Sequence, residues 1–220
     1  MQPDDLWACI ASLPVERRTL TVCSFSPLTE PSAPVAGWRR PVVGNHDTVA
    51  RLRLAVAHQR APYLLFVNAD CRLRDPFAVD LALGHLSQGR AVVGALLAYG
   101  DQVAAAGYAF GTRGPYPRYA GWSLDNERVL RPCGLQAVPL SFLATKRVTW
   151  NAVGGLRVDF QDRPYADADY CVRSSHLGQG GVFYEPSIVV DSPLLPPNDG
   201  AAAQLLIASA APTYDEWAVL

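Results

Sequence analysis

Strand-like and helix-like hydrophobic patterns alternate along the chain. An apolar strand, "YLLFV" (residues 63–67), lies between a predicted helix over residues 46–59 and a second helix over residues 77–88. Another apolar run, "AVVGALLAY" (91–99), follows. Strands that alternate with helices predict a helix-covered sheet, because each apolar strand face has to be buried. We therefore expect an α/β fold in which helices flank a mixed sheet.

The second half of the chain continues this pattern. "LQAVPLSFLATKRVTWNAVGG" (135–155) predicts a strand and then a helix from about Thr145 that stops at two glycines. Residues 165–181 predict a further helix, and residues 181–192 predict one or two strands. Residues 101–135 are rich in Gly, Tyr, Arg and Pro, which predicts exposed hairpins or a binding loop.

Chain length limits the number of domains. The 220 residues, half of them hydrophobic, suffice for one sizeable core and are too few for two. We therefore expect a single domain over residues 1–220.

Charge and hydropathy exclude several partners. The 19 basic and 20 acidic side chains are interspersed and give a net charge of -1, whereas nucleic acids and anionic membranes require clustered Lys and Arg. The amino terminus is acidic where a signal peptide is positive. The chain also lacks the run of about 18 apolar residues that a membrane span needs. We expect no nucleic-acid partner, no integral membrane segment and a cytoplasmic location.

The cysteines predict neither a disulfide framework nor a zinc site. They are five in number and scattered, without a CxxC pair. We expect reduced core residues at all five positions: Cys9, Cys23, Cys71, Cys133 and Cys171.

Asn68 and Asp70 follow directly on the strand of residues 63–67. Because they are two residues apart, their side chains can point the same way off the strand end. The amide offers hydrogen-bond donors and acceptors, and the carboxylate offers a hard oxygen ligand. Together they could hold a divalent cation and the polar part of a nucleotide at the carboxyl edge of an open sheet. Alternatively, Asn-Ala-Asp only turns the chain before the next helix.

Two further acidic positions have both a structural and a functional interpretation. Asp167 and Asp169 open a predicted helix in "YADADYCVR" (165–173), where carboxylates ordinarily stabilise the helix dipole. Asp191 closes the apolar run "SIVV", where an acid is commonly the first solvent-exposed residue of a strand end.

Taken together, three stretches resemble, in order and spacing, the family-2-type glycosyltransferases of the glycosyltransferase A fold. They are "APYLLFVNADCRL" (61–73), "VPLSFLATKRVTWNAVGGL" (138–156) and "YADADYCVRSSHLGQGGVFYEPSIVVDS" (165–192). In that family the first stretch carries the DxD motif and the second leads into a Gly-Gly turn. The third carries an acidic motif on a helix, followed by a strand that often ends in His. The resemblance covers residues 44–192 and implies a glycosyltransferase A-like sheet that binds a nucleotide-diphosphate sugar.

The resemblance also implies roles for individual residues. Asn68 and Asp70 match the DxD motif, with Asp70 at the metal-binding position, and Asp191 replaces a His that often helps to hold Mn²⁺ or Mg²⁺. Asp167 matches the general base that takes the proton of the acceptor hydroxyl. Arg173 could face the donor phosphates, although an arginine late in a helix is more often a solvated side chain. The implied reaction is an inverting transfer of the sugar to an acceptor hydroxyl.

Three departures from the family lie on the donor or catalytic side. Asn68 stands where the DxD motif usually has its first acid, and Ala166 stands where a glutamate usually precedes Asp167. A predicted helix over residues 4–12 and a strand over residues 19–27 match the family's first helix and second strand, so we expect its first strand to be missing. A missing strand would leave a sheet edge that a second copy or a partner chain could complete.

These departures keep three hypotheses open. The leading one is a metal-dependent glycosyltransferase that acts on a nucleotide-diphosphate sugar and an acceptor that the sequence does not identify. The second is a catalytically degenerate binding or scaffold protein that partners an active enzyme. The third, a nucleotidyltransferase, is disfavoured because the glycine-rich, lysine-containing loop at the amino terminus is absent. The sequence specifies neither the base nor the sugar.

Overall fold

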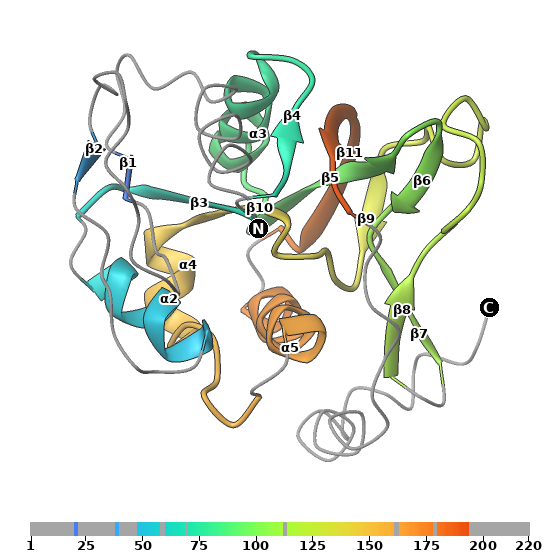
Figure 1. Cartoon of the computed structure of the whole chain (residues 1–220). Helices are drawn as coiled ribbons and strands as arrows, with labels where there is room; N and C mark the ends of the chain where they lie inside the picture. Colours follow the sequence, from blue (N-terminus) through green and yellow to red (C-terminus); the bar gives the residue numbers. More distant parts are fainter. Residues whose placement is uncertain are drawn as a thin grey trace.

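A seven-stranded mixed sheet forms the centre of the protein (Figure 1). The strand order is β3-β10-β5-β11-β4, with β6 beside β5 and β9 beside β11. The computed structural model describes residues 20–21, 38–39, 48–57, 60–68, 70–111, 114–160, 163–177 and 180–193. The strands of the central sheet are β3 (Tyr63–Val67), β4 (Arg72–Leu73), β5 (Val92–Tyr99), β6 (Gln102–Ala105), β9 (Cys133–Leu135), β10 (Phe142–Lys146) and β11 (Val182–Asp191).

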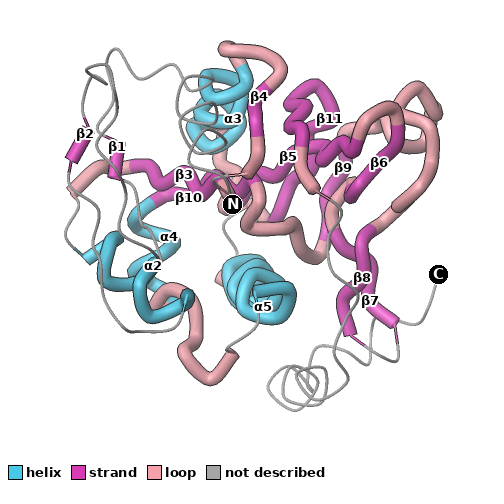
Figure 2. Tube along the Cα trace, in the orientation of Figure 1, coloured by secondary structure: helices cyan, strands magenta, loops and turns pink. Residues whose placement is uncertain are grey.

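Four described helices cover the two faces of this sheet (Figure 2). Helix α3 packs on one face, in a core formed with β5, β10 and β11. The other helices pack on the opposite face, in a second core. This arrangement confirms the predicted α/β class. The helices are α2 (Thr48–Ala57), α3 (Ala78–Ser87), α4 (Arg147–Val153) and α5 (Arg163–His176).

Two short pairs of strands lie outside the central sheet. Strands β1 (Leu20–Thr21) and β2 (Trp38–Arg39) pair in parallel. Strands β7 (Tyr108–Gly111) and β8 (Gly114–Pro117) pair antiparallel within the segment that we expected to contain hairpins.

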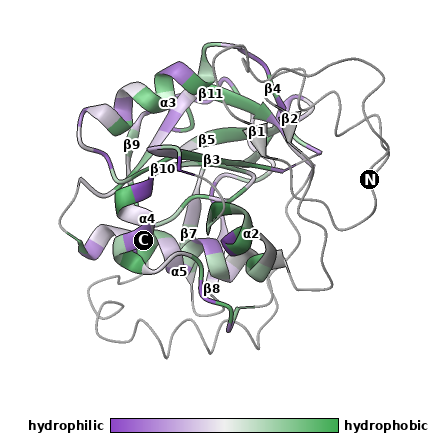
Figure 3. Cartoon of the chain, turned by 90° about the vertical axis from the view of Figure 1, so that its left-hand side faces the viewer, coloured by the Kyte–Doolittle hydropathy of each residue, from purple (hydrophilic) through white to green (hydrophobic). Residues whose placement is uncertain are grey.

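The two central strands, β5 and β11, are parallel and buried. Seven of the eight residues of β5 are buried, and only Tyr99 at its end is exposed. A strand that is covered on both faces has to be apolar throughout, which explains the run "VVGALLAY". Strand β5 is coloured as hydrophobic along most of its length in Figure 3.

The pairing of the strands brings three carboxyl ends to one edge of the sheet. Strands β3 and β5 both run antiparallel to β10, and β11 runs parallel to β5. Strand β11 pairs with β9 near its start and with β4 near its end, on either side of a break in its pairing with β5 between Glu185 and Val189. We call the edge where β3, β5 and β11 end the carboxyl edge.

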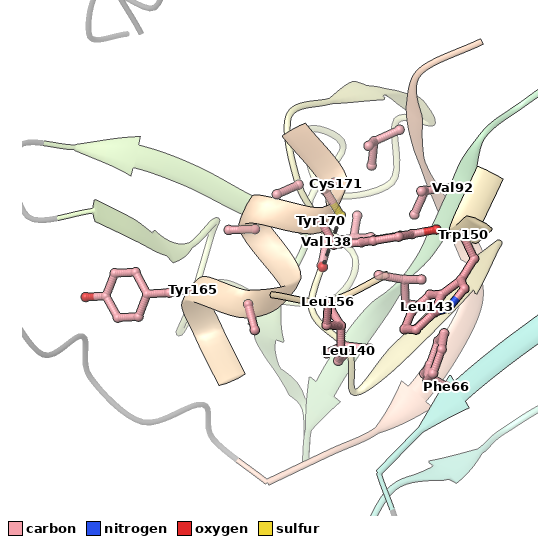
Figure 4. Close-up of a cluster of buried hydrophobic side chains, with 14 of the residues drawn as sticks. Phe66, Val92, Val138, Leu140, Leu143, Trp150, Leu156, Tyr165, Tyr170 and Cys171 are labelled. Carbon is pink, nitrogen blue, oxygen red and sulfur yellow. Dashed lines mark hydrogen bonds between the residues drawn. The ribbon is translucent and has the colours of Figure 1, made fainter. Parts of the chain in front are cut away.

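An aromatic cluster fixes α4 and α5 against the sheet (Figure 4). The ring centroids of Phe66 and Trp150 are 5.2 Å apart, and those of Trp150 and Tyr170 are 5.3 Å apart. The Tyr170 hydroxyl is hydrogen-bonded to Thr145, whose own hydroxyl donates to the carbonyl of Ala91. Burial raises the pKa of Tyr170 to about 12.

One local prediction is wrong, at Thr145. Thr145 lies in β10 rather than at a helix start, because its backbone pairs with both neighbouring strands and its hydroxyl is satisfied in the core. Helix α4 begins at Arg147 and ends, as predicted, before Gly154, whose φ of 76° is left-handed.

Other expectations have mixed outcomes. Cys71 and Cys171 are buried, Cys133 is partly buried, and none of these three described cysteines forms a disulfide. The predicted helix over residues 4–12, most of the strand over residues 19–27 and the two remaining cysteines lie outside the described residues.

Candidate functional site

Asn68 and Asp70 lie where the carboxyl edge was predicted to carry a ligand. Strand β3 ends at Val67, and the chain then turns toward β4. The Asn68 side-chain amide donates to the Ser141 hydroxyl at 3.0 Å, and its backbone N–H donates to the Ser141 carbonyl at 3.3 Å. Asn68 therefore fastens the end of β3 to the segment that precedes β10.

Asp70 presents its carboxylate to solvent. The Cys71 thiol, whose side chain is buried, lies 3.7 Å from Oδ1 of Asp70 and is a weak donor to it. An exposed carboxylate beside the end of β3 is available to a ligand without unfolding any part of the core.

The residues at this edge fit a divalent cation that is held by a single carboxylate. Mg²⁺ and Mn²⁺ prefer oxygen ligands, and Mg²⁺ usually binds through one or two carboxylates together with substrate phosphates. Asp70 offers such an oxygen. Within the described part of the chain, no three His, Cys, Asp or Glu side chains gather into a site that could hold a metal ion by themselves.

Asp191 reaches the same edge from β11, but its carboxylate is paired with an arginine. Both Nε and Nη2 of Arg74 donate to Oδ1 of Asp191, at 2.9 and 2.7 Å. The side chain of Asp191 is 47% exposed and that of Arg74 is 41% exposed. Asp191 also pairs through its backbone with Arg72 of β4. The edge therefore carries two acids, Asp70 and Asp191, together with two arginines.

Asp167 is buried, with only 2% of its surface exposed. Its Oδ2 accepts hydrogen bonds from the Leu140 backbone N–H at 2.9 Å and from the Tyr108 hydroxyl at 3.3 Å. Its Oδ1 accepts the Ala168 N–H at 2.9 Å. The carboxylate thus joins helix α5 to the segment before β10 and to the β7–β8 hairpin.

Residues 138–141, which we call the bridging segment, connect the two candidate motifs. Its Ser141 bonds to Asn68, and its Leu140 bonds to Asp167. The Cys171 thiol donates to the carbonyl of Val138 at 3.7 Å, and burial raises the pKa of this thiol. The bridging segment therefore connects Asp167 to the end of β3 through hydrogen bonds of two adjacent residues.

Arg173 contacts protein groups on several sides of its guanidinium. Its Nε and Nη2 donate to Oδ2 of Asp169, at 2.9 and 2.5 Å, and Asp169 has a side chain that is only 4% exposed. Nη1 donates to the carbonyl of Val153 and Nη2 to that of Gly155, at 2.5 and 2.8 Å. These contacts satisfy carbonyls at the end of α4, so the geometry gives Arg173 a structural role at that helix end.

Sequence reasoning missed three residues of this region: Tyr108, Ser141 and Arg74. The pattern "CRLRDP" does contain a signal for Arg74, because alternate residues of a short strand share one face. Tyr108 and Ser141 had no local signal, since their partners lie 59 and 73 residues away along the chain.

The fold is similar to solved glycosyltransferases. A mannosyltransferase, PcManGT from Pyrobaculum calidifontis, solved with GDP-Man and Mn²⁺, matches 93% of this chain with a TM-score of 0.61 and 14% identity. GalNAc-T7, solved with UDP, GalNAc and Mn²⁺, matches 81% with a TM-score of 0.59 and 10% identity. The chain has a glycosyltransferase A-like fold. A mycobacterial protein also matches, over 100% of the chain, with a TM-score of 0.58 and 16% identity.

These similarities have clear limits. The chain spans 56% of the length of the mannosyltransferase and 38% of that of GalNAc-T7. The sequence matches no protein-family model and no curated protein. The fold prediction is therefore confirmed, whereas the family-2 assignment remains a prediction.

None of the described helices combines the length and the hydrophobicity that crossing a bilayer requires.

Proposed function

We propose that this protein is a metal-dependent, inverting glycosyltransferase that moves a sugar from a nucleotide-diphosphate sugar to an acceptor hydroxyl. The observation that carries the proposal is the exposed carboxylate of Asp70 at the carboxyl edge of a glycosyltransferase A-like sheet. The solved proteins of similar fold include two that contain a nucleotide or nucleotide sugar together with Mn²⁺, which supports the same ligand class here.

On the donor side, Asp70 would hold Mn²⁺ or Mg²⁺ against the diphosphate. When bound, such a cation neutralises charge that develops on the departing nucleotide diphosphate. Asn68 keeps the end of β3, and with it the position of Asp70, in place through its two bonds to Ser141. Asp70, Asp191, Arg72 and Arg74 carry formal charges that sum to zero, so a cation at Asp70 would strengthen the attraction of this edge for a diphosphate.

On the acceptor side, Asp167 would take the proton of the acceptor hydroxyl as that oxygen attacks the anomeric carbon from the face opposite the leaving group. A single displacement of this kind inverts the anomeric centre. The Tyr108 hydroxyl, which is 3.3 Å from Oδ2, is an oxygen donor of the kind that an acceptor hydroxyl would supply to this carboxylate. An acceptor would have to replace this phenol or approach beside it, because Asp167 is only 2% exposed.

Binding and turnover test the proposal separately. Calorimetric titration with UDP and GDP, in Mn²⁺ and in EDTA, should detect a nucleotide whose affinity rises with the metal. A ligand at 100 times its dissociation constant also stabilises the fold by about 2.7 kcal/mol, which thermal unfolding detects. Release of nucleoside diphosphate from the matching sugar donors then measures turnover. Failure of every nucleotide to bind in Mn²⁺ would overturn the proposal.

The burial of Asp167 favours a second candidate function, a glycosyltransferase-like binding or scaffold protein. In this alternative Asp167 serves only to fasten α5 to the bridging segment and to Tyr108. Nucleotide binding without transfer or donor hydrolysis, in the presence of a range of saccharide acceptors, would select this function over the enzyme.

A further inference from the structure

Arg74 is held in a fixed orientation at the carboxyl edge. Its Nε and Nη2 bond to Asp191, and Nη2 also donates to the carbonyl of Gly100 at 3.1 Å. Its backbone N–H donates to the carbonyl of Val189 at 3.0 Å. Contacts from β11 and from the turn after β5 therefore restrain both the backbone and the side chain.

The restrained guanidinium still has donors to offer. Its Nη1 makes no hydrogen bond or ion pair with the described residues, and the side chain is 41% exposed. A planar guanidinium suits phosphate oxygens because its N–H groups can donate in parallel. A group that is already oriented also loses less side-chain entropy when a ligand binds.

Asp191, in contrast, is poorly suited to bind a cation while this pair persists. Both contacts from Arg74 fall on its Oδ1, within 2.9 Å. A divalent cation on the same carboxylate would lie close to a positive guanidinium and be repelled by it. The geometry therefore gives Asp191 the function of orienting Arg74.

We propose that Arg74, positioned by Asp191, binds the diphosphate of the donor directly and does so without the metal. This inference rests on the proposed function and adds a second, arginine-based source of positive charge to the one at Asp70. Arg74 is the binding residue, and Asp191 is a positioning residue that acts through it. The alternative is that Asp191 is a metal ligand, as the sequence resemblance implies.

A double-mutant cycle with inorganic pyrophosphate tests this inference, because pyrophosphate carries the diphosphate but no base or sugar. Calorimetric titration is carried out in EDTA. Arg74→Gln should weaken pyrophosphate binding by about 10- to 100-fold, the usual effect of losing hydrogen bonds to a charged group. Asp191→Asn should weaken it in the same direction. The double variant should be no weaker than Arg74→Gln alone, because both changes remove one interaction.

Two further arginine variants serve as controls for the loss of pyrophosphate binding. Arg90→Gln removes an arginine whose guanidinium lies 4.3 Å from the Phe183 ring centroid, before the start of β5 and so away from the carboxyl edge. This variant should bind pyrophosphate like the unmodified protein. Arg74→Lys keeps the positive charge but lacks the planar guanidinium that donates parallel hydrogen bonds. It should bind pyrophosphate with intermediate affinity. The pyrophosphate affinity of Arg74→Lys also tests the inference if Arg74→Gln unfolds.

The outcomes separate this inference from the proposed function. Equal pyrophosphate affinity in Arg74→Gln and the unmodified protein, or no binding in EDTA by the unmodified protein, overturns the inference while Mn²⁺-dependent nucleotide binding still supports the function. If Asp191→Asn instead raises the Mn²⁺ concentration that nucleotide binding needs, and Arg74→Gln does not, Asp191 is a metal ligand and the inference is wrong. Absence of nucleotide binding even in Mn²⁺ overturns both.

Discussion

The backbone N–H of Leu140 donates a 2.9 Å hydrogen bond to Oδ2 of Asp167. This bond joins a helix to the residues that lead into β10, and Ser141 next to it is bonded to Asn68 at the end of β3. The two acidic motifs of the sequence, although about 100 residues apart, thus share one short bridging segment (138–141). Changes that displace this segment should therefore alter both motifs.

Gly94→Ala should displace the bridging segment. A Cβ at Gly94 would lie 2.4 Å from Cβ of Val138, too close for β5 and the bridging segment to keep their positions. Overpacking of this kind typically costs about 1–3 kcal/mol, which chemical denaturation would measure as a lower free energy of unfolding. Gly84→Ala is the control: its Cβ meets nothing within 4 Å, and alanine within a helix should stabilise by up to about 1 kcal/mol. Equal stability of the two variants would contradict the packing at Val138.

The elements of the sheet could be predicted because their patterns are local. The strand "YLLFV" was predicted with the bounds of β3 (63–67), and α2 and α3 lie within their predicted ranges. The helix stop at Gly154 was predicted because a left-handed residue at a helix end favours glycine. Thr145 was misassigned because its place in β10 depends on partners in β3 and β5, which are distant in the sequence.

The candidate site was predictable only as a set of positions. The spacing of Asn68 and Asp70 indicated a ligand site at a strand end, but it did not indicate that Ser141 binds the Asn68 amide. Likewise, no local pattern revealed that Asp167 is buried under Tyr108. Such contacts depend on how loops from different parts of the sheet pack together. Packing between distant loops leaves no hydrophobic periodicity and no local motif in a single sequence.

Arg173→Gln should destabilise the fold without changing nucleotide affinity. The change removes the nearer of the two arginines that face Asp169, whose side chain is only 4% exposed, and it also frees the carbonyls of Val153 and Gly155. Breaking one side of a buried ion pair costs about 3–5 kcal/mol, although the 26% exposure of Arg173 favours the lower end. Arg157→Gln should cost less, about 1 kcal/mol, because Arg157 pairs at 2.8 Å with the exposed Asp159 and reaches Asp169 only at 3.9 Å. A selective loss of nucleotide binding in Arg173→Gln would restore its predicted phosphate role.

The stability of the protein should fall between about pH 10 and pH 12 in part because of Tyr170. Burial raises the pKa of this phenol from 10.0 to about 12. Since the folded state holds the proton more tightly than the unfolded state, the stabilisation is complete below pH 10 and is lost as the pH rises toward 12. Tyr170→Phe should flatten this part of a plot of unfolding free energy against pH. Part of the slope should remain, because burial also raises the pKa of Tyr184. An unchanged slope in Tyr170→Phe would contradict the assignment.

Asp70→Ala should abolish the Mn²⁺ dependence of nucleotide binding and leave the fold intact. The side chain is exposed and its only described hydrogen bond comes from the Cys71 thiol, so its loss should change the melting temperature little. Asp101→Ala, which removes another exposed acid from the turn after β5, is the matched control and should retain the metal dependence. Calorimetric titrations in Mn²⁺ and in EDTA provide the measurement. If Asp70→Ala binds nucleotide more tightly in Mn²⁺ than in EDTA, the metal ligand lies elsewhere.

Asp167→Asn distinguishes the glycosyltransferase hypothesis from the binding-protein hypothesis. A general base acts in the transition state, so removing its charge should lower transfer by about 10²–10⁴-fold and leave donor affinity unchanged. The variant should also lose about 1–3 kcal/mol of unfolding free energy. The reason is that an amide NH₂ group must then face either the Ala168 N–H or the donors from Leu140 and Tyr108.

Tyr108→Phe controls for this loss of stability. It removes one neutral hydrogen bond to Asp167, at a cost of about 1 kcal/mol, and keeps the carboxylate. If Asp167 is the base, transfer should fall far more in Asp167→Asn than in Tyr108→Phe, when both are measured at a temperature where each is folded. A carboxylate that only fastens α5 to the bridging segment predicts a different result: both variants would lose stability, and neither would lose turnover selectively. Full transfer activity in Asp167→Asn would remove this residue from the mechanism, and the role of base would have to pass to another group.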